Sequence, residues 1–264
     1  MQATEQQGNP VKHARLKDIA GLTDIGLKRG NNEDAIAWDA ALGLALVSDG
    51  LGGCNGGEVA SLTAVRSIKN DMQAAMRANG AGAKLRTDDD LVVLVRELIR
   101  RANQKILAMA ARDPSLQGMG ATLAIALLTG DRIAIANVGD SRVYRMRGGN
   151  LAQLTRDHLI VNEMIERGYL SAEQAHATQL HNILTRSLGM EGPLEVDIAL
   201  HPVESGDLYL LCSDGLTGAV SDDELAVHLR DPQAGLRELV HGAVLLANRN
   251  GGHDNISAVL MSIA

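Results

Sequence analysis

Four aspartates that border strongly apolar stretches are the residues of this sequence best placed to do chemistry. Asp49 ends LALVSD, Asp140 ends IAIANVGD, Asp214 ends LYLLCSD, and Asp254 precedes the last apolar stretch. One aspartate after a strand is usually a turn residue. Here Ser-Asp-Gly-Leu occurs at both Asp49 and Asp214, and each is followed by a helical segment instead of a returning strand. The set predicts a site for Mg²⁺ or Mn²⁺, which prefer carboxylate, carbonyl and water oxygens.

A polar loop, RGNNED from Arg29 to Asp34, adds a different kind of chemistry. The guanidinium of Arg29 can bind two oxygens of a phosphate group, and Glu33 and Asp34 place two more carboxylates in the same loop. The loop is a candidate phosphate-binding segment, with a solvated turn before the next strand as the alternative.

Short strands and two pairs of helices must position these residues. Apolar runs and alternation predict strands at 35–40, 42–48, 121–129, 132–139, 142–147, 151–155, 194–200, 207–213 and 256–263. Helical spacing predicts helices at 58–78, 88–113 (opened by Thr87), 221–230 and 234–250. The links between strands 121–155 are too short for parallel crossovers, so we expect antiparallel neighbours. The expected fold class is α+β, a four-layer α-β-β-α sandwich of two antiparallel sheets flanked by helix pairs.

Composition narrows the class of protein. The chain has 264 residues, 45% of them hydrophobic, which suits one domain with a large core. We expect a loose tail at 1–18 and a single domain at 19–264. With 25 basic against 32 acidic residues and no basic block, neither nucleic acid nor an anionic membrane is an expected partner. No apolar run reaches the ~18 residues of a membrane span, and the first residues lack a signal-peptide core.

Cysteine usage excludes two further classes of protein. Cys54 and Cys212 are the only cysteines, too few for a disulfide scaffold, and neither belongs to a zinc-binding cluster. Cys212, inside LYLLCS, is expected to be a small buried hydrophobe. A reducing cytoplasm is the simplest compartment for such a chain.

The order of the motifs resembles that of the metal-dependent protein phosphatase (PPM, type 2C) family in its compact bacterial form. The resemblance spans about residues 19–263 and rests on six segments in order: Arg29-x-x-Asn32-Glu33-Asp34, Asp49-Gly50-Leu51-Gly52-Gly53, Gly120-Ala121-Thr122, Val138-Gly139-Asp140-Ser141-Arg142, Ser213-Asp214-Gly215-Leu216 and Gly251-Gly252-His253-Asp254-Asn255. It implies hydrolysis of phosphoserine and phosphothreonine on proteins by a water that bridges two Mn²⁺ or Mg²⁺ ions, without a protein nucleophile.

The resemblance also implies a role for each site residue. Asp49 bridges the two ions, the Gly50 carbonyl binds one of them, Asp214 and Asp254 complete the other, and Glu33 holds a metal-bound water. The remaining implied roles are a weaker third ion at Asp140 and Asp214, a phosphate clamp at Arg29, a supporting partner of the ligands at Asp34, and ordering of the loop around Asp254 by Asn255. The expected partners are phosphorylated proteins of a bacterial serine/threonine kinase pathway, met by a monomeric phosphatase.

Two positions depart from the pattern or add to it. Leu51 stands where some family members carry a histidine proposed as general acid, so the leaving group must receive its proton from metal-bound water or another group. Cys54 lies close to the expected metals and is interpreted as a small side chain, with a regulatory thiol as the alternative.

The irregular segment 156–190, with His158, His176 and His181, matches the family's flap beside the active site, where substrate contacts are expected.

Two other functions compete with this interpretation. Dinucleotide binding is suggested by DGLGGCNGG after an apolar strand, but Asn55 stands where the third glycine belongs, and the short links argue against a parallel sheet. A catalytically silent phosphatase-like module that binds phosphoproteins is the non-enzymatic alternative. The presence of every expected metal-binding aspartate favours the enzyme.

Overall fold

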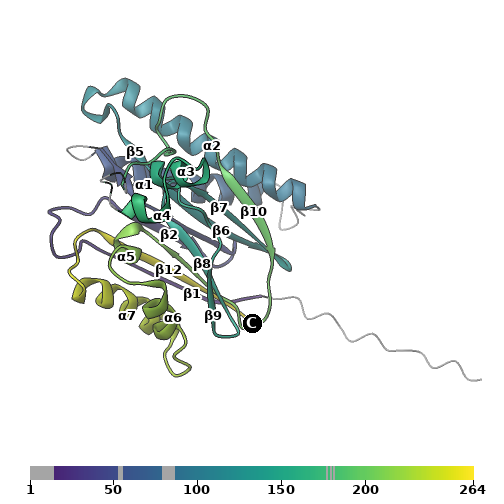
Figure 1. The fold of residues 1–264 in the computed structure, drawn as a ribbon. Coiled ribbons are helices and arrows are strands. Elements are labelled where there is room, and N and C mark those ends of the chain that lie inside the picture. Colours follow the sequence, from purple (N-terminus) through teal and green to yellow (C-terminus); the bar gives the residue numbers. More distant parts are fainter. Residues whose placement is uncertain (1–14, 53–55, 79–86, 177, 179, 181) are drawn as a thin grey trace, which may run out of the picture.

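The computed structural model describes residues 15–52, 56–78, 87–176, 178, 180 and 182–264 and contains two antiparallel sheets that face each other (Figure 1). One sheet has the strand order β1 (Leu16–Asp24), β12 (Ile256–Ile263), β11 (Leu208–Cys212), β8 (Arg142–Arg147) and β9 (Asn150–Gln153). The other has the order β10 (Asp197–Pro202), β7 (Arg132–Val138), β6 (Leu123–Thr129), β3 (Leu44–Ser48) and β2 (Ala35–Asp39).

Each sheet carries a pair of helices on its outer face. Helices α1 (Gly56–Ala78) and α2 (Asp88–Arg112) cover the β10–β2 sheet, and α6 (Asp222–Leu229) and α7 (Leu236–Arg249) cover the β1–β9 sheet (Figure 1). Three short helices stand outside these layers: α3 (Ile160–Glu166), α4 (Ala172–His176) and α5 (Asp214–Thr217). The predicted four-layer α-β-β-α sandwich is confirmed. None of the described helices combines the length and apolarity of a membrane span.

Side-chain alternation explains how one strand serves two cores. On the fully buried strand β3, Leu44 and Leu46 pack toward α1 and α2, whereas Ala45 and Val47 pack between the sheets. Successive side chains of a strand point to opposite faces, so a strand covered on both faces reads as a continuous apolar run. This is why the run at 42–48 indicated a strand buried on both sides.

Helix α2 begins where the sequence predicted. Thr87 accepts a hydrogen bond from the backbone N–H of Asp90, and the Asp90 carboxylate accepts one from the Thr87 N–H, forming a capping box. Three aspartates in the first turn also interact favourably with the positive end of the helix dipole.

Three local predictions differ from the structure. β1 was not predicted as a strand, and it starts at Leu16, so residues 16–18 of the expected tail lie in it; residues 1–14 lie outside the described residues. Its long antiparallel pairing with β12 holds it, a contact that its own alternation does not signal. The link 139–141 joins β7 to β8 in the opposite sheet, not to an antiparallel neighbour.

The third difference lies at the start of the predicted strand 121–129. Gly120–Ala121 form a separate short strand, β5, which pairs with β4 (Gly50–Leu51), and β6 begins only at Leu123. The break falls at Thr122, whose N–H donates to the carbonyl of Asp49 (2.8 Å). The strand is interrupted because Thr122 bonds to the segment that follows β3.

Antiparallel pairing brings the polar segments to one end of the sandwich. In one sheet Ala35 pairs with Ser48 and Leu123 with Val138, so the segments before β2, after β3 and after β7 lie at the same edge. In the other sheet Cys212 pairs with Ala258, which places the end of β11 beside the start of β12. All the expected site residues follow or precede these strand ends.

The core predicts a sharp contrast between two substitutions. Ile125 is 1% exposed in the cluster under α1 and α2, so Ile125→Ala should lower the free energy of unfolding by about 2–5 kcal/mol. Val93 on α2 is 65% exposed, and Val93→Ala should change it by less than about 0.5 kcal/mol. Urea unfolding followed by circular dichroism measures both values, and equal losses would contradict the packing described here.

Candidate active site

A cleft of about 340 Å³ opens at this end of the sandwich, and nearly all of the expected site residues line it. The expected residues in its wall are Arg29, Glu33, Asp49, Gly50, Asp140, Asp214, Asp254 and Asn255. Leu51, Gly52, Asn182 and Leu184 complete the lining. Asp34 lies behind this wall, buried to 8% exposure. Segments more than 200 residues apart in the chain therefore meet in one cavity.

Thr122 fixes the backbone of Asp49. The N–H of Asp49 donates to Thr122 Oγ1 at 2.9 Å, and its carbonyl accepts from the Thr122 N–H at 2.8 Å. Ser48 Oγ donates to the Thr122 carbonyl at 2.6 Å, and Thr122 Oγ1 lies 2.7 Å from Ser141 Oγ. Asp49 is thus held by a buried network of neutral groups.

Gly50 lies where no side chain fits. A Cβ atom at this position would stand 2.1 Å from the Gly57 carbonyl oxygen and 2.6 Å from that of Glu33. The Gly50 N–H donates to the Glu33 carbonyl at 3.1 Å, which ties the RGNNED loop to the strand after Asp49. The close approach of three backbone segments explains the glycine.

Asp34 and Asp214 belong to one buried polar cluster. Ser213 Oγ donates to Asp34 Oδ2 at 2.7 Å, and Ser213 is the N-cap residue of α5, in whose first turn Asp214 lies. Oδ1 of Asp34 and Oδ1 of Asp214 are both buried without a hydrogen-bond partner among the described residues. Asp214 lines the cleft, so its unsatisfied oxygen is an acceptor that a cation in the cleft can use.

Asn255 connects the RGNNED loop to the start of β12. Its Oδ1 accepts from the Glu33 N–H at 2.8 Å, and its Nδ2 donates to the carbonyls of Ile25 and Asn31, both at 2.9 Å. With 5% exposure it is a buried support. These contacts fix the loop that carries Glu33; the ordering of the loop around Asp254 by Asn255 stays a prediction.

Burial raises the pKa values of three carboxyl groups that line the cleft, Asp49, Asp140 and Asp214, and of Asp34. Burial raises the pKa of Asp140 to about 7, with the charges of Asp214 and Asp157 adding to the effect. Burial likewise raises the pKa of Asp34 to about 7 and that of Asp49 well above its usual range, and it raises the pKa of Asp214. Negative neighbours within one cluster reinforce each shift.

Arg29 contacts one carboxyl group of the cleft, that of Asp254. Its Nη2 donates to Asp254 Oδ2 at 2.6 Å, and this hydrogen bond raises the pKa of the guanidinium. The Arg29 side chain is 50% exposed and lies at the mouth of the cleft. The guanidinium therefore neutralises part of one carboxylate while remaining accessible from solvent.

The donor set suits a hard, hydrated cation. In the described part of the chain, no group of three or more His, Cys, Asp or Glu side chains is arranged to hold one metal ion as it stands. Mg²⁺ and similar ions keep several waters and take one or two carboxylates, so they do not need such a closed cage. Clustered carboxylates with unsatisfied oxygens fit that mode of binding.

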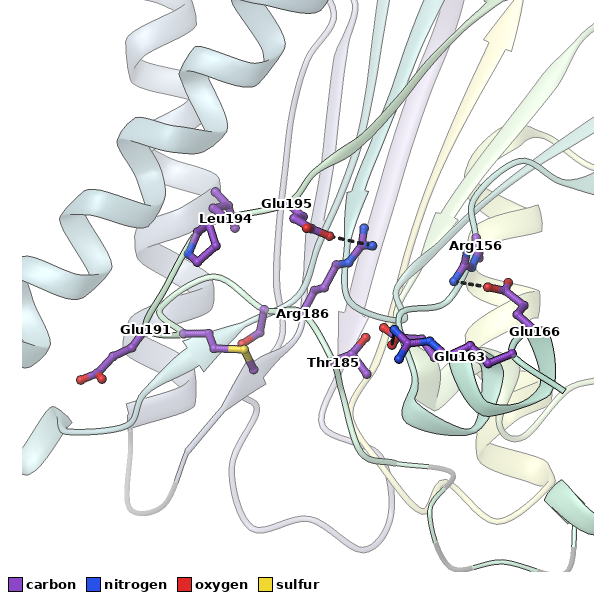
Figure 2. A pocket seen from close by; sticks show the side chains of 12 residues that line it. Arg156, Glu163, Glu166, Thr185, Arg186, Glu191, Leu194 and Glu195 are labelled. Carbon is purple, nitrogen blue, oxygen red and sulfur yellow. Dashed lines mark hydrogen bonds and ion pairs between the residues drawn. The ribbon is translucent and has the colours of Figure 1, made fainter. Parts of the chain in front are cut away.

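Sequence reasoning missed residues that come from the irregular segment. Asn182 and Leu184 line the cleft, whereas the neighbouring Thr185–Ser187 line a second cavity of about 410 Å³ that α3 also borders. Figure 2 shows two ion pairs of this second cavity, Arg156–Glu166 at 2.7 Å and Arg186–Glu195 at 2.9 Å. No motif marked Asn182 or Leu184, because side chains of irregular segments follow no period.

The structure describes only some of the cysteines and histidines that the sequence analysis singled out. Cys212 is a fully buried free cysteine, as predicted. His158 is 1% exposed and so cannot contact a substrate. Cys54, His181 and the side chain of His176 lie outside the described residues.

Comparison with known proteins agrees with the motif order. The model of the family described as protein phosphatase 2C matches residues 28–250. The serine/threonine phosphatase stp of Listeria welshimeri is 36% identical over 242 residues, which cover 90% of this chain and 93% of that protein. The serine/threonine protein phosphatase PstP of Mycobacterium tuberculosis is 36% identical over 248 residues, but this match covers only 44% of PstP.

Solved structures extend the similarity to three dimensions. A serine/threonine phosphatase of S. agalactiae superposes with a TM-score of 0.84 at 34% identity, covering 94% of this chain and 99% of that one. The catalytic domain of PstP in complex with two manganese ions superposes with a TM-score of 0.79 at 32% identity, covering 96% and 99%. The family and enzyme class expected from the motifs are thereby confirmed, and the chain belongs to the protein phosphatase 2C family of serine/threonine phosphatases.

Proposed function

We propose that this phosphatase hydrolyses phosphoserine and phosphothreonine on proteins with the help of two Mn²⁺ or Mg²⁺ ions held in the cleft. The observation that carries the proposal is the convergence of Glu33, Asp49, Asp140, Asp214 and Asp254 on one cavity with Arg29 at its mouth. The manganese-bound PstP structure supports the choice of metal.

Each carboxylate has an assigned role in this proposal. Asp49 and the Gly50 carbonyl would hold one ion, Asp49, Asp214 and Asp254 would hold the other, and Glu33 would bind through water. Asp140 with Asp214 would hold a weaker third ion. Asp34 and Asn255 support the ligands from behind, through Ser213 and through the loop of Glu33 respectively.

The lining of the cleft constrains the reaction. When bound, divalent cations lower the pKa of a water and offset charge on the phosphoryl transition state. Among the described lining residues there is no Ser, Cys, His, Lys or Tyr, which supports a water molecule as the nucleophile. Leu51 lies in the wall and supplies no proton, which leaves a carboxyl group or water to protonate the leaving oxygen.

Arg29 is assigned to the phosphate. Its guanidinium is exposed at the mouth and permanently charged, and it can bind two phosphoryl oxygens at once. In the described structure it binds Asp254, so a phosphate that reaches the cleft competes with that carboxylate for Arg29.

The biological setting proposed is the reversal of a bacterial serine/threonine kinase. The substrates are phosphorylated proteins, neither nucleic acid nor a membrane is a partner, and the chain acts as a cytoplasmic monomer.

Metal dependence is the decisive test of this function. Hydrolysis of p-nitrophenyl phosphate should require millimolar-range Mn²⁺ or Mg²⁺ and disappear in EDTA, because the proposed nucleophile is a water that the cations activate. Asp49→Asn and Asp214→Asn should each lower kcat more than about a hundredfold, since even outer partners of a metal are worth about 10–100-fold.

Asp231→Asn changes an exposed carboxylate that does not line the cleft, so it is the matched control and should retain the wild-type rate. Full activity after exhaustive chelation would contradict the role of the ions. A wild type without phosphatase activity that still binds phosphoproteins would instead identify the silent module.

Arg29→Ala tests the phosphate clamp. A charge-assisted hydrogen bond is worth roughly 1.5–3 kcal/mol, so kcat/KM should fall on the order of ten- to a hundredfold, mostly through KM. Arg29→Lys should recover only part, and inhibition by inorganic phosphate should weaken in parallel. Because Arg29 neutralises Asp254, its removal should not weaken Mn²⁺ binding. If Arg29→Ala instead weakens Mn²⁺ binding and leaves inhibition by phosphate unchanged, Arg29 belongs to the metal site.

The raised pKa of Asp140 predicts a pH-dependent stability of the metal-free protein. Between pH about 4 and about 7 the folded state holds a proton on Asp140 that the unfolded chain has released, so stability falls as pH rises through this window. Asp140→Asn has no group that titrates at this position, so it should not lose this stability as the pH rises. In EDTA the variant should melt a few degrees above the wild type at pH 7.5, and the difference should shrink at pH 5.5. A variant no more stable than the wild type at pH 7.5 would refute the shift.

A further inference from the structure

His158 joins three parts of the chain beside the cleft. Its N–H donates to the Gly139 carbonyl at 3.0 Å, and its own carbonyl accepts from the Thr185 N–H at 2.9 Å. Its side chain, 1% exposed, accepts a hydrogen bond from the Gly139 N–H at Nδ1 (3.0 Å) and reaches Asp197 Oδ2 with Nε2 (3.1 Å). One buried residue thus links the segment after β7, the segment beside the cleft and β10.

These contacts define the tautomer of the ring. A backbone N–H can only donate, so Nδ1 must be unprotonated, and the neutral imidazole then carries its proton on Nε2. That proton is donated to Asp197, whose other oxygen accepts from Arg186 Nη1 at 2.9 Å. Burial also lowers the pKa of His158, which favours the neutral ring.

Arg186 braces the far side of this arrangement. It binds Asp197 with Nη1 and Glu195 with Nη2, both at 2.9 Å, and the second pair is visible in Figure 2. The Nη1 atom lies 3.4 Å from His158 Nε2. Two donors facing each other cannot form a hydrogen bond, so Asp197 is the acceptor for both of them.

Gly139 lies between His158 and the cleft and is tightly packed. It has a φ of 99°, and a Cβ atom on it would lie 2.7 Å from Thr122 Cγ2. Gly139 is therefore confined between Thr122, which holds Asp49, and the double hydrogen bond to His158. The next residue is Asp140, which lines the cleft.

We propose that His158, as the neutral Nε2–H tautomer, is a positioning residue that orients Asp140 through Gly139. It couples this orientation to the segment that contributes Asn182 and Leu184 to the cleft. The inference rests on the proposed function for its effect on activity. The tautomer and the support of Asp140 can be tested without activity.

Two amide substitutions separate the roles of the two ring nitrogens. In His158→Asn the side-chain oxygen can take the place of Nδ1 and accept from Gly139, whereas in His158→Gln the amide reaches toward Asp197 and leaves the Gly139 N–H without its acceptor. His158→Gln should raise the Mn²⁺ concentration for half-maximal rate on the order of 10-fold or more, with KM for p-nitrophenyl phosphate little changed. For His158→Asn the Mn²⁺ concentration for half-maximal rate should stay within about 3-fold of the wild-type value.

A double-mutant cycle distinguishes positioning from general stability. If His158 acts through Asp140, then His158→Gln in an Asp140→Ala background should cause no further loss of activity or Mn²⁺ binding. His201→Asn is the matched control, because His201 is a partly buried histidine on β10 whose Nε2 has no hydrogen-bond partner among the described residues. Melting temperatures of all variants show whether a loss follows stability instead.

Two activity-independent measurements complete the test. Long-range ¹H–¹⁵N spectra of the metal-free wild type should show His158 protonated at Nε2 and not at Nδ1. Equilibrium Mn²⁺ titration without substrate should show weaker binding for His158→Gln than for His158→Asn.

The outcomes remain distinguishable. A wild type without metal-dependent phosphatase activity would overturn the proposed function, while the spectra and the titration would still decide on His158. An Nδ1–H tautomer, equal effects of the two amides, or additive losses in the cycle would overturn the positioning role.

Discussion

Repulsion among the carboxyl groups at one end of the sandwich is the constraint to which the surrounding structure responds. Asp34, Asp49, Asp140 and Asp214 all have raised pKa values, first because they are removed from water and then because they face one another. Neutral donors support part of this set, such as the hydroxyl of Ser213 on Asp34. A neutral donor leaves the charge of a carboxylate uncompensated once it ionises, so this charge is available to external cations.

The antiparallel topology makes this concentration of charge possible. In an antiparallel pair the end of one strand lies beside the start of the next, so consecutive segments return to the same edge of the sheet. The crossing between sheets at 139–141 and the pairing of β11 with β12 bring Asp140, Asp214 and Asp254 to one edge from both layers. The sandwich core can then be apolar on both faces of β3 and β6, with the polar groups confined to its end.

Periodicity and motif order predicted the layers of the fold and most residues of the cleft. They did not predict individual contacts between residues that lie far apart in the sequence. The continuous run at 42–48 and the capping box at Thr87 carry their structure in local sequence. β1 does not, because its partner β12 lies more than 200 residues away. Thr122 interrupts a run that reads as one strand, since its hydrogen bonds to Asp49 depend on tertiary structure. For the same reason no local pattern shows that Arg29 binds Asp254.

The site and the stability of the fold are therefore linked. Carboxylates that must ionise inside the cleft destabilise the metal-free fold near neutral pH, because the unfolded chain ionises them without this cost. Whatever neutralises them in the folded state alone, cations above all, stabilises that state by mass action. The two apolar clusters beneath the helix pairs and the third between the sheets must offset the cost when the cleft holds no cation. The rigid supports at Thr122, Gly50 and Asn255 have the matching role at short range: they keep mutually repelling groups from moving apart, so that the carboxyl oxygens are already in place before a cation arrives.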